Sequence, residues 1–284
     1  MCEIQNRLLL AAGLALTFVW SPAFAETDNA LLASIRKAGD VKVAMASQPP
    51  YMLISPNGEA QGTVLEVENM ILKELGLPMI KPQLTAWSAM IPALQGRQVD
   101  FVADLAPTEE RCKAVLFTAP IYVYRVALYV RSGNPKRLTG IAHLAQSPDI
   151  KVAMIDGSAQ GAYALKNGVK PEQVVRVPDV QAGVATVLNG RADAYVESTT
   201  AVNHPEKMGL DLVVDEQAPV SGASAAFRKE DVSFRDAFDE KRMAMVKSGV
   251  IQKLYDKYGL SGGDAQAQML AKVSKASDLV PSCQ

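Results

Sequence analysis

Apolar residues recur along this chain with two different spacings. Positions 64, 67, 71, 72 and 75 are all Val, Ile or Leu, and steps of three and four residues place them on one face of a helix. Short runs rich in Val, Ala and aromatic residues lack this spacing and predict buried strands. The pattern as a whole predicts strands at 41–45, 100–104, 125–130, 150–154, 193–197 and 223–228. It predicts helices at 29–39, 64–75, 87–95, 180–188, 234–247, 250–258 and 264–275.

A strand, a helix, a Gly-Arg turn and an Asp-led strand occur in the same order twice. The first copy contains VKVAM at 41–45, has LQGR downstream and ends at Asp104. The second contains IKVAM at 150–154, has LNGR downstream and ends at Glu197. The repeat predicts two similar α/β lobes with one carboxylate at the equivalent strand end of each. Because ligands bind outside the carboxyl ends of strands in open α/β sheets, two facing lobes would form a cleft with an acid on each wall.

The chain is expected to cross between the lobes twice. A second lobe made only of the segment up to about 223 would be short, and the first lobe has room for the later strand and the last helices. The sequence therefore predicts an α/β protein with a two-strand hinge, a design that suits closure around a ligand. The expected boundaries are 26–129 for the first part of lobe 1, 130–225 for lobe 2, and 226–284 for the return to lobe 1 and the tail.

The N-terminus has the pattern of a secretory signal peptide. Arg7 precedes an apolar run at 8–20, and the string AFA at 23–25 has the small residues of a cleavage site. The apolar run is shorter than the ~20 residues that a membrane-spanning helix requires. We therefore expect 1–25 to be removed and the mature protein to reside in the periplasm.

The overall composition restricts the possible partners. The chain has 284 residues, enough for about two domains. Its net charge of −1 gives no support for a nucleic-acid partner, which would require a basic excess. His143 and His204 have no companion cysteines at metal-ligand spacing, so both are expected at the surface. We expect a monomer with no cofactor and no metal.

Two cysteines, Cys112 and Cys283, remain after removal of the signal peptide. An oxidising compartment favours a disulfide between them, and two free thiols are the alternative. A bridge would fasten the polar C-terminal tail to lobe 1.

The segment TEER at 108–111, followed by FTAPIY at 117–122, resembles the signature of the family 3 periplasmic solute-binding proteins. In that family T-x-x-R precedes an F-[ST]-x-P-[YF] string. Further matching strings occur in the family's order over nearly the whole mature chain, at 50–51, 87–94, 130–135 and 227–229. The resemblance implies the type II periplasmic-binding-protein fold, with two lobes and a two-strand hinge.

The resemblance also implies ligand-binding residues in lobe 1. The arginine that matches Arg111 usually binds the ligand's carboxylate, for which a planar guanidinium is well suited. A helix-surface arginine is the alternative. Trp87 and Tyr51 match aromatic positions next to the ligand, although each is also a plausible core residue. Gln48 stands where many members have a stacking aromatic, and Ala106 where many have Ser or Thr. Those two and Asp104, often Gly or Ser in the family, complete the predicted set.

Lobe 2 is expected to contribute two groups of residues. The string GSAQ at 157–160 lies between a strand and a helix, and such a turn presents backbone N–H groups that suit an anion. Ser158, Ala159 and Gln160 are therefore candidates. Ser198 matches a position where amino-acid binders commonly have Asp. Glu197 is one residue away, and strand alternation would turn it to the opposite face.

Within the family, the stretches at 110–113, 133–136 and 178–181 look most like the ectoine- and hydroxyectoine-binding branch, whose ligands are compact zwitterions. The resemblance thus implies a periplasmic protein that delivers a small zwitterion, either an amino acid or an ectoine-like solute, to an ABC permease. Two alternatives remain open. One is a periplasmic lyase similar to cyclohexadienyl dehydratase, with Asp104 or Glu197 as general acid or base. The other is a signalling module that presents the lobes to a sensor.

Overall fold

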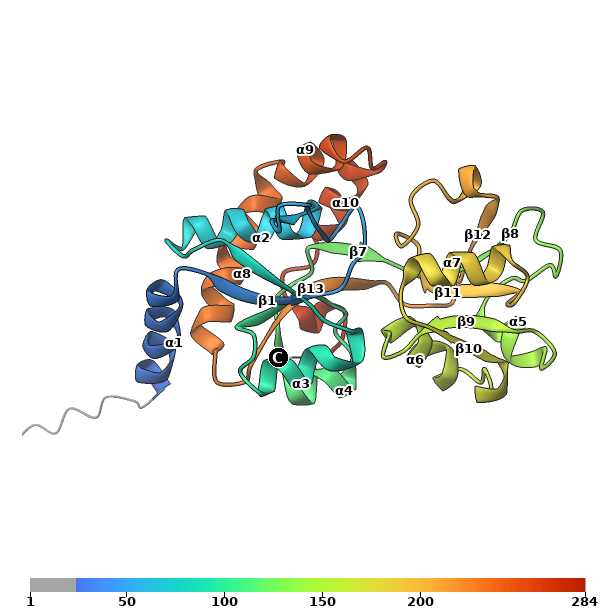
Figure 1. Ribbon diagram of the computed structural model, residues 1–284, viewed down its shortest axis with the longest axis horizontal. Coiled ribbons are helices and arrows are strands. Elements are labelled where there is room, and N and C mark those ends of the chain that lie inside the picture. The colour runs from blue at the N-terminus through green and yellow to red at the C-terminus, as the bar shows by residue number, and fades with distance from the viewer. Residues whose placement is uncertain (1–23, 284) are drawn as a thin grey trace, which may run out of the picture.

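Two β-sheets lie side by side along the long axis of the molecule, and helices cover both faces of each (Figure 1). This computed structural model describes residues 24–283, with side chains from residue 31 onward. We call the sheet formed mainly by the first part of the chain, with its helices, lobe 1, and the other lobe 2. The predicted α/β architecture with two lobes is confirmed.

Lobe 1 contains a six-stranded sheet in the order β4–β1–β5–β13–β6, with β7 also paired to β13. The first three strands are parallel, and β13 is antiparallel to β5. Strand β5 is buried at every position because helices cover both of its faces. The strands are β1 (Val41–Met45), β4 (Ile80–Leu84), β5 (Phe101–Leu105), β6 (Leu116–Phe117), β7 (Tyr122–Tyr124) and β13 (Ser221–Phe227), and a separate hairpin pairs β2 (Leu53–Ile54) with β3 (Ala60–Gln61).

Lobe 2 repeats this arrangement with a five-stranded sheet in the order β10–β9–β11–β8–β12. Three parallel strands are again followed by an antiparallel one, β8, which pairs with β11. The strands are β8 (Val126–Arg131), β9 (Val152–Ile155), β10 (Val174–Val177), β11 (Ala194–Ser198) and β12 (Leu210–Val214).

One detail of the repeat is identical at the level of hydrogen bonds. In lobe 1 the backbone N–H of Asp100 donates to the Lys42 carbonyl (2.7 Å), and the Lys42 N–H donates to the Asp100 carboxylate (2.8 Å). In lobe 2 Asp193 and Lys151 make the same two bonds, at 2.8 and 2.9 Å. The aspartate that leads each central strand therefore closes a ring with the first strand. The predicted repeat reflects two equivalent structural units.

The helices of lobe 1 cover its sheet on two sides. One side packs a cluster of aromatic rings from β5, β13 and α8 under four helices: α1 (Phe24–Ala38), α2 (Thr63–Glu74), α8 (Val232–Lys247) and α9 (Val250–Lys257). The other side is covered by α3 (Met90–Gln95) and α4 (Glu109–Ala114). A further helix, α10 (Gly263–Leu270), packs against α9 and ends earlier than the predicted 264–275.

In lobe 2, α5 (Ile141–Gln146) and α6 (Ala159–Lys166) pack on one face of the sheet, and α7 (Val180–Leu188) packs on the other. Short 3₁₀ helices complete the chain: η1 (Trp87–Ala89), η2 (Pro171–Gln173), η3 (Pro205–Met208) and η4 (Ala276–Asp278). The predicted helix at 87–95 is therefore divided into η1 and α3.

The two crossings between lobes occur earlier than expected. Tyr129 lies inside β8 of lobe 2, and Ala225 lies inside β13 of lobe 1. Strand β8 pairs with β11 along its whole length, so the apolar run belongs to lobe 2 from Val126 onward. The first crossing is therefore at Arg125, and the second lies between β12 and β13. The Arg125 guanidinium donates to the Ala218 carbonyl at 3.1 Å, which joins the two crossings.

The predicted disulfide between Cys112 and Cys283 is confirmed, with their Cα atoms 5.0 Å apart. Both cysteines are buried in the cluster beneath α3 and α4, so the bridge holds the tail on lobe 1. The predicted signal peptide falls outside the described residues, except that Phe24 and Ala25 begin α1. Among the residues that are described, no helix has the length and apolar content needed to cross a bilayer.

Candidate functional site

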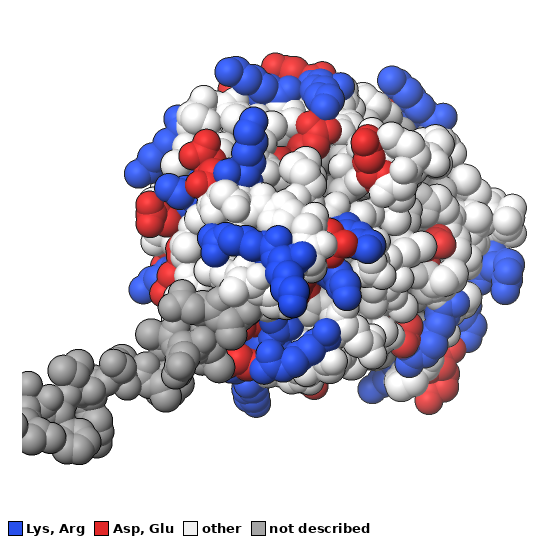
Figure 2. Space-filling model, turned by 60° about the vertical axis from the view of Figure 1, so that its left-hand side comes forward, with Lys and Arg blue, Asp and Glu red and all other residues white. Residues whose placement is uncertain are grey.

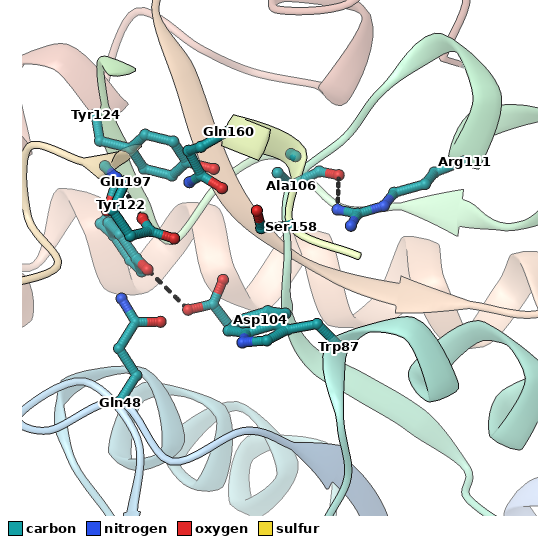
Figure 3. Close-up of a pocket in the computed structure, with 12 residues that line it drawn as sticks. Gln48, Trp87, Asp104, Ala106, Arg111, Tyr122, Tyr124, Ser158, Gln160 and Glu197 are labelled. Atoms are coloured by element: carbon teal, nitrogen blue, oxygen red, sulfur yellow. Dashed lines mark hydrogen bonds between the residues drawn. The ribbon is translucent and has the colours of Figure 1, made fainter. Parts of the chain in front are cut away.

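A small pocket lies between the two lobes, at the carboxyl ends of β5 and β11 (Figure 3). Every predicted ligand-binding residue lines it except Tyr51, and two tyrosines that were not predicted join them. Lobe 1 contributes Gln48, Trp87, Asp104, Ala106, Arg111, Tyr122 and Tyr124, and lobe 2 contributes Ser158, Ala159, Gln160, Glu197 and Ser198.

Asp104 is the penultimate residue of β5, and its side chain is buried in the pocket wall, with 4 % of the residue exposed. Its carboxylate accepts a hydrogen bond from the Tyr122 hydroxyl at 2.8 Å. Burial raises the pKa of Asp104 to about 7, while the Tyr122 hydrogen bond and the positive charge of Arg111 act in the opposite direction. A cation placed in the pocket would therefore favour the ionised form.

Glu197 is the penultimate residue of β11 and is also buried, with 7 % exposed. Burial raises its pKa to about 7, and the negative charge of Asp104 adds to the rise. Its carboxylate accepts the backbone N–H of Ser198. Strand alternation would turn Glu197 and Ser198 to opposite faces, yet both line the pocket. The strand ends at Ser198, whose carbonyl accepts the N–H of Ala201, so the chain turns before alternation separates the two side chains.

Arg111 reaches from lobe 1 to lobe 2. The Thr108 hydroxyl caps α4 by accepting a hydrogen bond from the Arg111 N–H at 3.2 Å. The guanidinium donates through Nη1 to the Ala106 carbonyl (2.9 Å) and through Nη2 to the Gly157 carbonyl of lobe 2 (2.7 Å). Burial lowers its pKa. A guanidinium has further N–H donors beyond these two bonds, and they are available for an anion.

Aromatic rings form much of the wall on the lobe 1 side. Trp87 begins η1, and Tyr122 and Tyr124 follow each other by two residues on β7, so both face the pocket. Tyr51 lies behind this wall and stacks on Tyr122 with ring centroids 4.7 Å apart. Tyr51 thus supports a pocket residue instead of lining the pocket. Alternation after Pro120 is the sequence signal that identifies both tyrosines.

The turn between β9 and α6 places a helix N-terminus at the pocket. Ser158 caps α6 by accepting the N–H of Gly161 at 3.0 Å, and Ala159 and Gln160 form its first turn. The positive end of the helix dipole and its unpaired N–H groups favour an anionic group at this wall. The turn at 157–160 that the sequence singled out therefore lies at the pocket.

Both histidines lie away from the pocket lining, His143 beside Thr139 and His204 beside Glu206. Within residues 24–283 no cluster of His, Cys, Asp and Glu has the arrangement of a metal site. What the pocket offers is two carboxylates, one guanidinium, a helix N-terminus and three aromatic rings. That combination suits a small molecule with charges of both signs.

Residues 41–261 match the family described as bacterial extracellular solute-binding proteins, family 3. The chain belongs to this family. The type II fold inferred from the sequence is confirmed by a crystal structure of EhuB in complex with hydroxyectoine, which superposes with a TM-score of 0.80 at 30 % identity over 89 % of this chain and 98 % of that one. A second solved structure, an ancestral amino acid-binding protein described as a precursor of cyclohexadienyl dehydratase, has a TM-score of 0.71 and 27 % identity, and covers 80 % of this chain and 98 % of its own.

Two relatives known by sequence agree with this assignment. A probable amino-acid ABC transporter periplasmic-binding protein of Sinorhizobium fredii is 28 % identical over 80 % of this chain and 79 % of its own. The histidine-binding periplasmic protein of Salmonella typhimurium is 25 % identical over 88 % of this chain and 96 % of its own. This solute-binding protein therefore has periplasmic proteins as its relatives, in agreement with the predicted location.

Proposed function

We propose that the pocket binds one small zwitterion, with the ligand's carboxylate at Arg111 and its cationic group at Asp104. The protein serves as the substrate-binding component of an ABC transporter and delivers the ligand to the permease. The observation that carries this proposal is the separation of charge in the pocket: Figure 3 shows Asp104 and Glu197 toward one side and Arg111 toward the other.

The acidic side of the pocket favours a cation. Two carboxyl groups are buried there, and a buried carboxylate without a counter-charge is costly. A ligand cation between Asp104 and Glu197 would offset that cost, and the faces of Tyr122, Tyr124 and Trp87 would add cation–π attraction. A neutral ligand would supply no positive charge to offset the burial of either acid.

The opposite side favours a carboxylate. The remaining donors of Arg111 and the N-terminus of α6 meet at this wall, and both are suited to an anion. The carboxylate would then be held by groups from both lobes. Binding would for that reason favour the closed arrangement of the two lobes.

Hydroxyectoine, L-arginine and L-histidine are the zwitterions we would test first, and we refer to them as the zwitterion panel. EhuB was solved in complex with hydroxyectoine, the Salmonella typhimurium relative is named a histidine-binding protein, and a further relative from Pseudomonas aeruginosa is named an L-arginine-binding protein. Native mass spectrometry of the protein as purified identifies any ligand retained from the cell. Calorimetry with the panel then measures affinity. The proposal would be contradicted if no panel compound and no retained compound bound with one-to-one stoichiometry.

A lyase activity is the second candidate, because pKa values of about 7 at Asp104 and Glu197 suit general acid–base catalysis. We favour the transport role, because the relatives are transporter components and the guanidinium and helix N-terminus supply binding groups. Incubation with prephenate separates the two functions. Product formation that is lost in Asp104→Asn supports the lyase, and binding of a zwitterion without turnover supports transport.

The two crossings at Arg125 and between β12 and β13 would act as the hinge of a monomer. Small-angle scattering with and without a panel compound tests this motion, and we expect a smaller radius of gyration with ligand. Superimposable curves at saturating ligand would contradict hinge closure.

A further inference from the structure

At Gly157 the backbone of lobe 2 lies directly against lobe 1. Gly157 occupies the turn between β9 and α6, with a φ of +74°, a left-handed conformation that favours glycine. A Cβ at this position would lie 2.8 Å from the backbone nitrogen and 2.9 Å from the Cα of Ser88, in η1 of lobe 1. Both neighbours are backbone atoms, so no side-chain rotation would relieve the overlap. The lobes approach this closely because residue 157 has no side chain.

The same residue is also held from a second element of lobe 1. Arg111, in α4, donates through Nη2 to the Gly157 carbonyl at 2.7 Å, and its Nη1 is fixed on the Ala106 carbonyl. A hydrogen bond from a charged donor is stronger than one between neutral groups. Gly157 is therefore contacted by η1 on one side and by the α4 guanidinium on the other.

This contact lies in the wall between two cavities. Outside the ligand pocket a larger groove runs between the lobes, and Trp87, Arg111, Ser158 and Ala159 line both spaces. Gly157 lines the groove but not the pocket. The contact from Ser88 and Arg111 thus separates the pocket from the groove without requiring Gly157 to touch a ligand.

We propose that Gly157 is a positioning residue that allows a protein–protein latch, formed by Ser88, Arg111 and Gly157, to hold the lobes closed even without ligand. The ligand adds its own contacts to a closed form that the latch already populates. The balance between open and closed molecules is then set partly by a residue outside the ligand pocket, whatever the ligand proves to be.

The test compares Gly157→Ala with Gly209→Ala in the ligand-free protein. Gly209 is also in lobe 2 and has a φ of +81°, but a Cβ there would meet its nearest atom, Leu188 Cδ2, only at 3.9 Å. Both variants therefore carry similar backbone strain, and only Gly157→Ala adds an overlap between the lobes. Single-molecule fluorescence transfer between dyes at the exposed residues Leu84 and Lys166, one on each lobe, reports the closed and open populations. The dyes are attached through non-natural amino acids, so that the native disulfide is untouched.

We expect the ratio of closed to open molecules to fall by about tenfold or more in Gly157→Ala, because the added methyl group would overlap packed atoms only in the closed form. In Gly209→Ala the ratio should stay within about twofold of the wild type, with both variants melting at similar temperatures. The proposal is overturned if the wild type shows no closed population without ligand, if Gly157→Ala matches the wild type, or if Gly209→Ala falls as far as Gly157→Ala. None of these readouts requires a ligand, so they are independent of the proposed transport role.

Discussion

Asp104 in lobe 1 and Glu197 in lobe 2 occupy the same position in two equivalent sheets, yet their surroundings differ. Each is the penultimate residue of the strand that an aspartate leads, and burial raises the pKa of each to about 7. Asp104 accepts a tyrosine hydroxyl and lies near the charge of Arg111. The Glu197 carboxylate accepts a hydrogen bond from the backbone N–H of the adjacent Ser198, and the negative charge of Asp104 raises its pKa further.

This difference shows that two structurally equivalent lobes can present different side chains to the same pocket. Lobe 1 supplies the charged pair and the aromatic wall, and it also holds the disulfide. Lobe 2 supplies a helix N-terminus and an acid whose pKa the negative charge of Asp104 raises further. We therefore expect lobe 1 to determine most of the ligand affinity and lobe 2 to contribute mainly through closure.

Removal of the guanidinium should have the largest effect on affinity. In Arg111→Ala the ligand's carboxylate loses a charged, desolvated partner, and affinity should fall by about 2–5 kcal/mol. Arg111→Lys should recover only part of this loss, because an ammonium cannot form the two-pronged contact. Calorimetry with a binding panel compound measures both variants. Unchanged affinity in Arg111→Ala would show that lobe 1 does not hold the carboxylate.

The contributions of Asp104 and Glu197 to ligand affinity can be compared by replacing each acid with its neutral amide of the same shape. Asp104→Asn should weaken binding by about 1–3 kcal/mol, since the ligand cation would face an amide where it now faces a carboxylate. Glu197→Gln should cost less, because the positive charge of Arg111 acts on Asp104, whereas the charge that acts on Glu197 is the negative one of Asp104. Calorimetric measurement of ligand affinity in both variants therefore compares the contributions of the two lobes. An equal or larger loss in Glu197→Gln would reverse the assignment of roles.

Stability of the ligand-free protein should depend on the same two acids. Their folded pKa values, about 7, exceed the unfolded values of 3.8 and 4.5, so the folded state holds protons that the unfolded state releases. The stability gained in this way is fully present below about pH 4 and is lost as the pH rises through about 7. Thermal melts between pH 5 and about pH 8 should therefore show a falling melting temperature in the wild type, with a smaller fall in the double variant Asp104→Asn/Glu197→Gln.

Glu68 provides the background for that measurement. It is buried in α2, neither of its carboxylate oxygens has a hydrogen-bond partner, and burial raises its pKa well above the usual range. The negative charge of Asp104 also raises the pKa of Glu68. Because Glu68 is present in the wild type and in the double variant, the difference between their pH profiles reports the two pocket acids together with the effect of Asp104 on Glu68. Identical profiles would mean that Asp104 and Glu197 do not change protonation in this range.

Much of the lobe architecture was predictable because periodicity reports local structure. The repeat identified both Asp-led strands, the family strings located Arg111 and Trp87, and the position between a strand and a helix identified the turn at 157–160. The crossings were placed too late because an apolar strand gives no sign of the sheet to which it belongs. Glu68 was missed because a glutamate is expected at the surface, although its spacing from the apolar positions of α2 places it on the buried face.

The pocket tyrosines were missed for a different reason. Tyr122 lies in the string that carried the family resemblance, and Tyr124 follows it on the same face of β7. Tyr51 was expected in the pocket, but only the packing of the folded chain places it behind Tyr122. Sequence identifies candidates of the right chemistry, and tertiary packing decides which of two stacked rings lines the pocket.

Loss of the disulfide should have the smallest effect on the site. The bridge joins residues 171 positions apart, and the chain-entropy treatment gives about 5 kcal/mol as an upper limit on its stabilisation. Cys112 faces the core beneath α4 whereas Arg111 faces the cleft, so affinity in Cys112→Ser/Cys283→Ser should stay within about twofold of the wild type. Hydrogen exchange should show faster opening in lobe 1 and little change in lobe 2. Equally faster exchange in both lobes would contradict a stabilising effect of the bridge that is confined to lobe 1.

Calorimetry that compares each zwitterion of the panel with its carboxamide tests the central claim most directly. The amide retains the cation and the shape of the ligand but removes the charge that Arg111 is proposed to bind. We predict that at least one zwitterion binds with one-to-one stoichiometry, that its amide binds at least about a hundredfold more weakly, and that Arg111→Ala abolishes most of this difference. Equal affinity of a zwitterion and its amide for the wild-type protein would contradict the account.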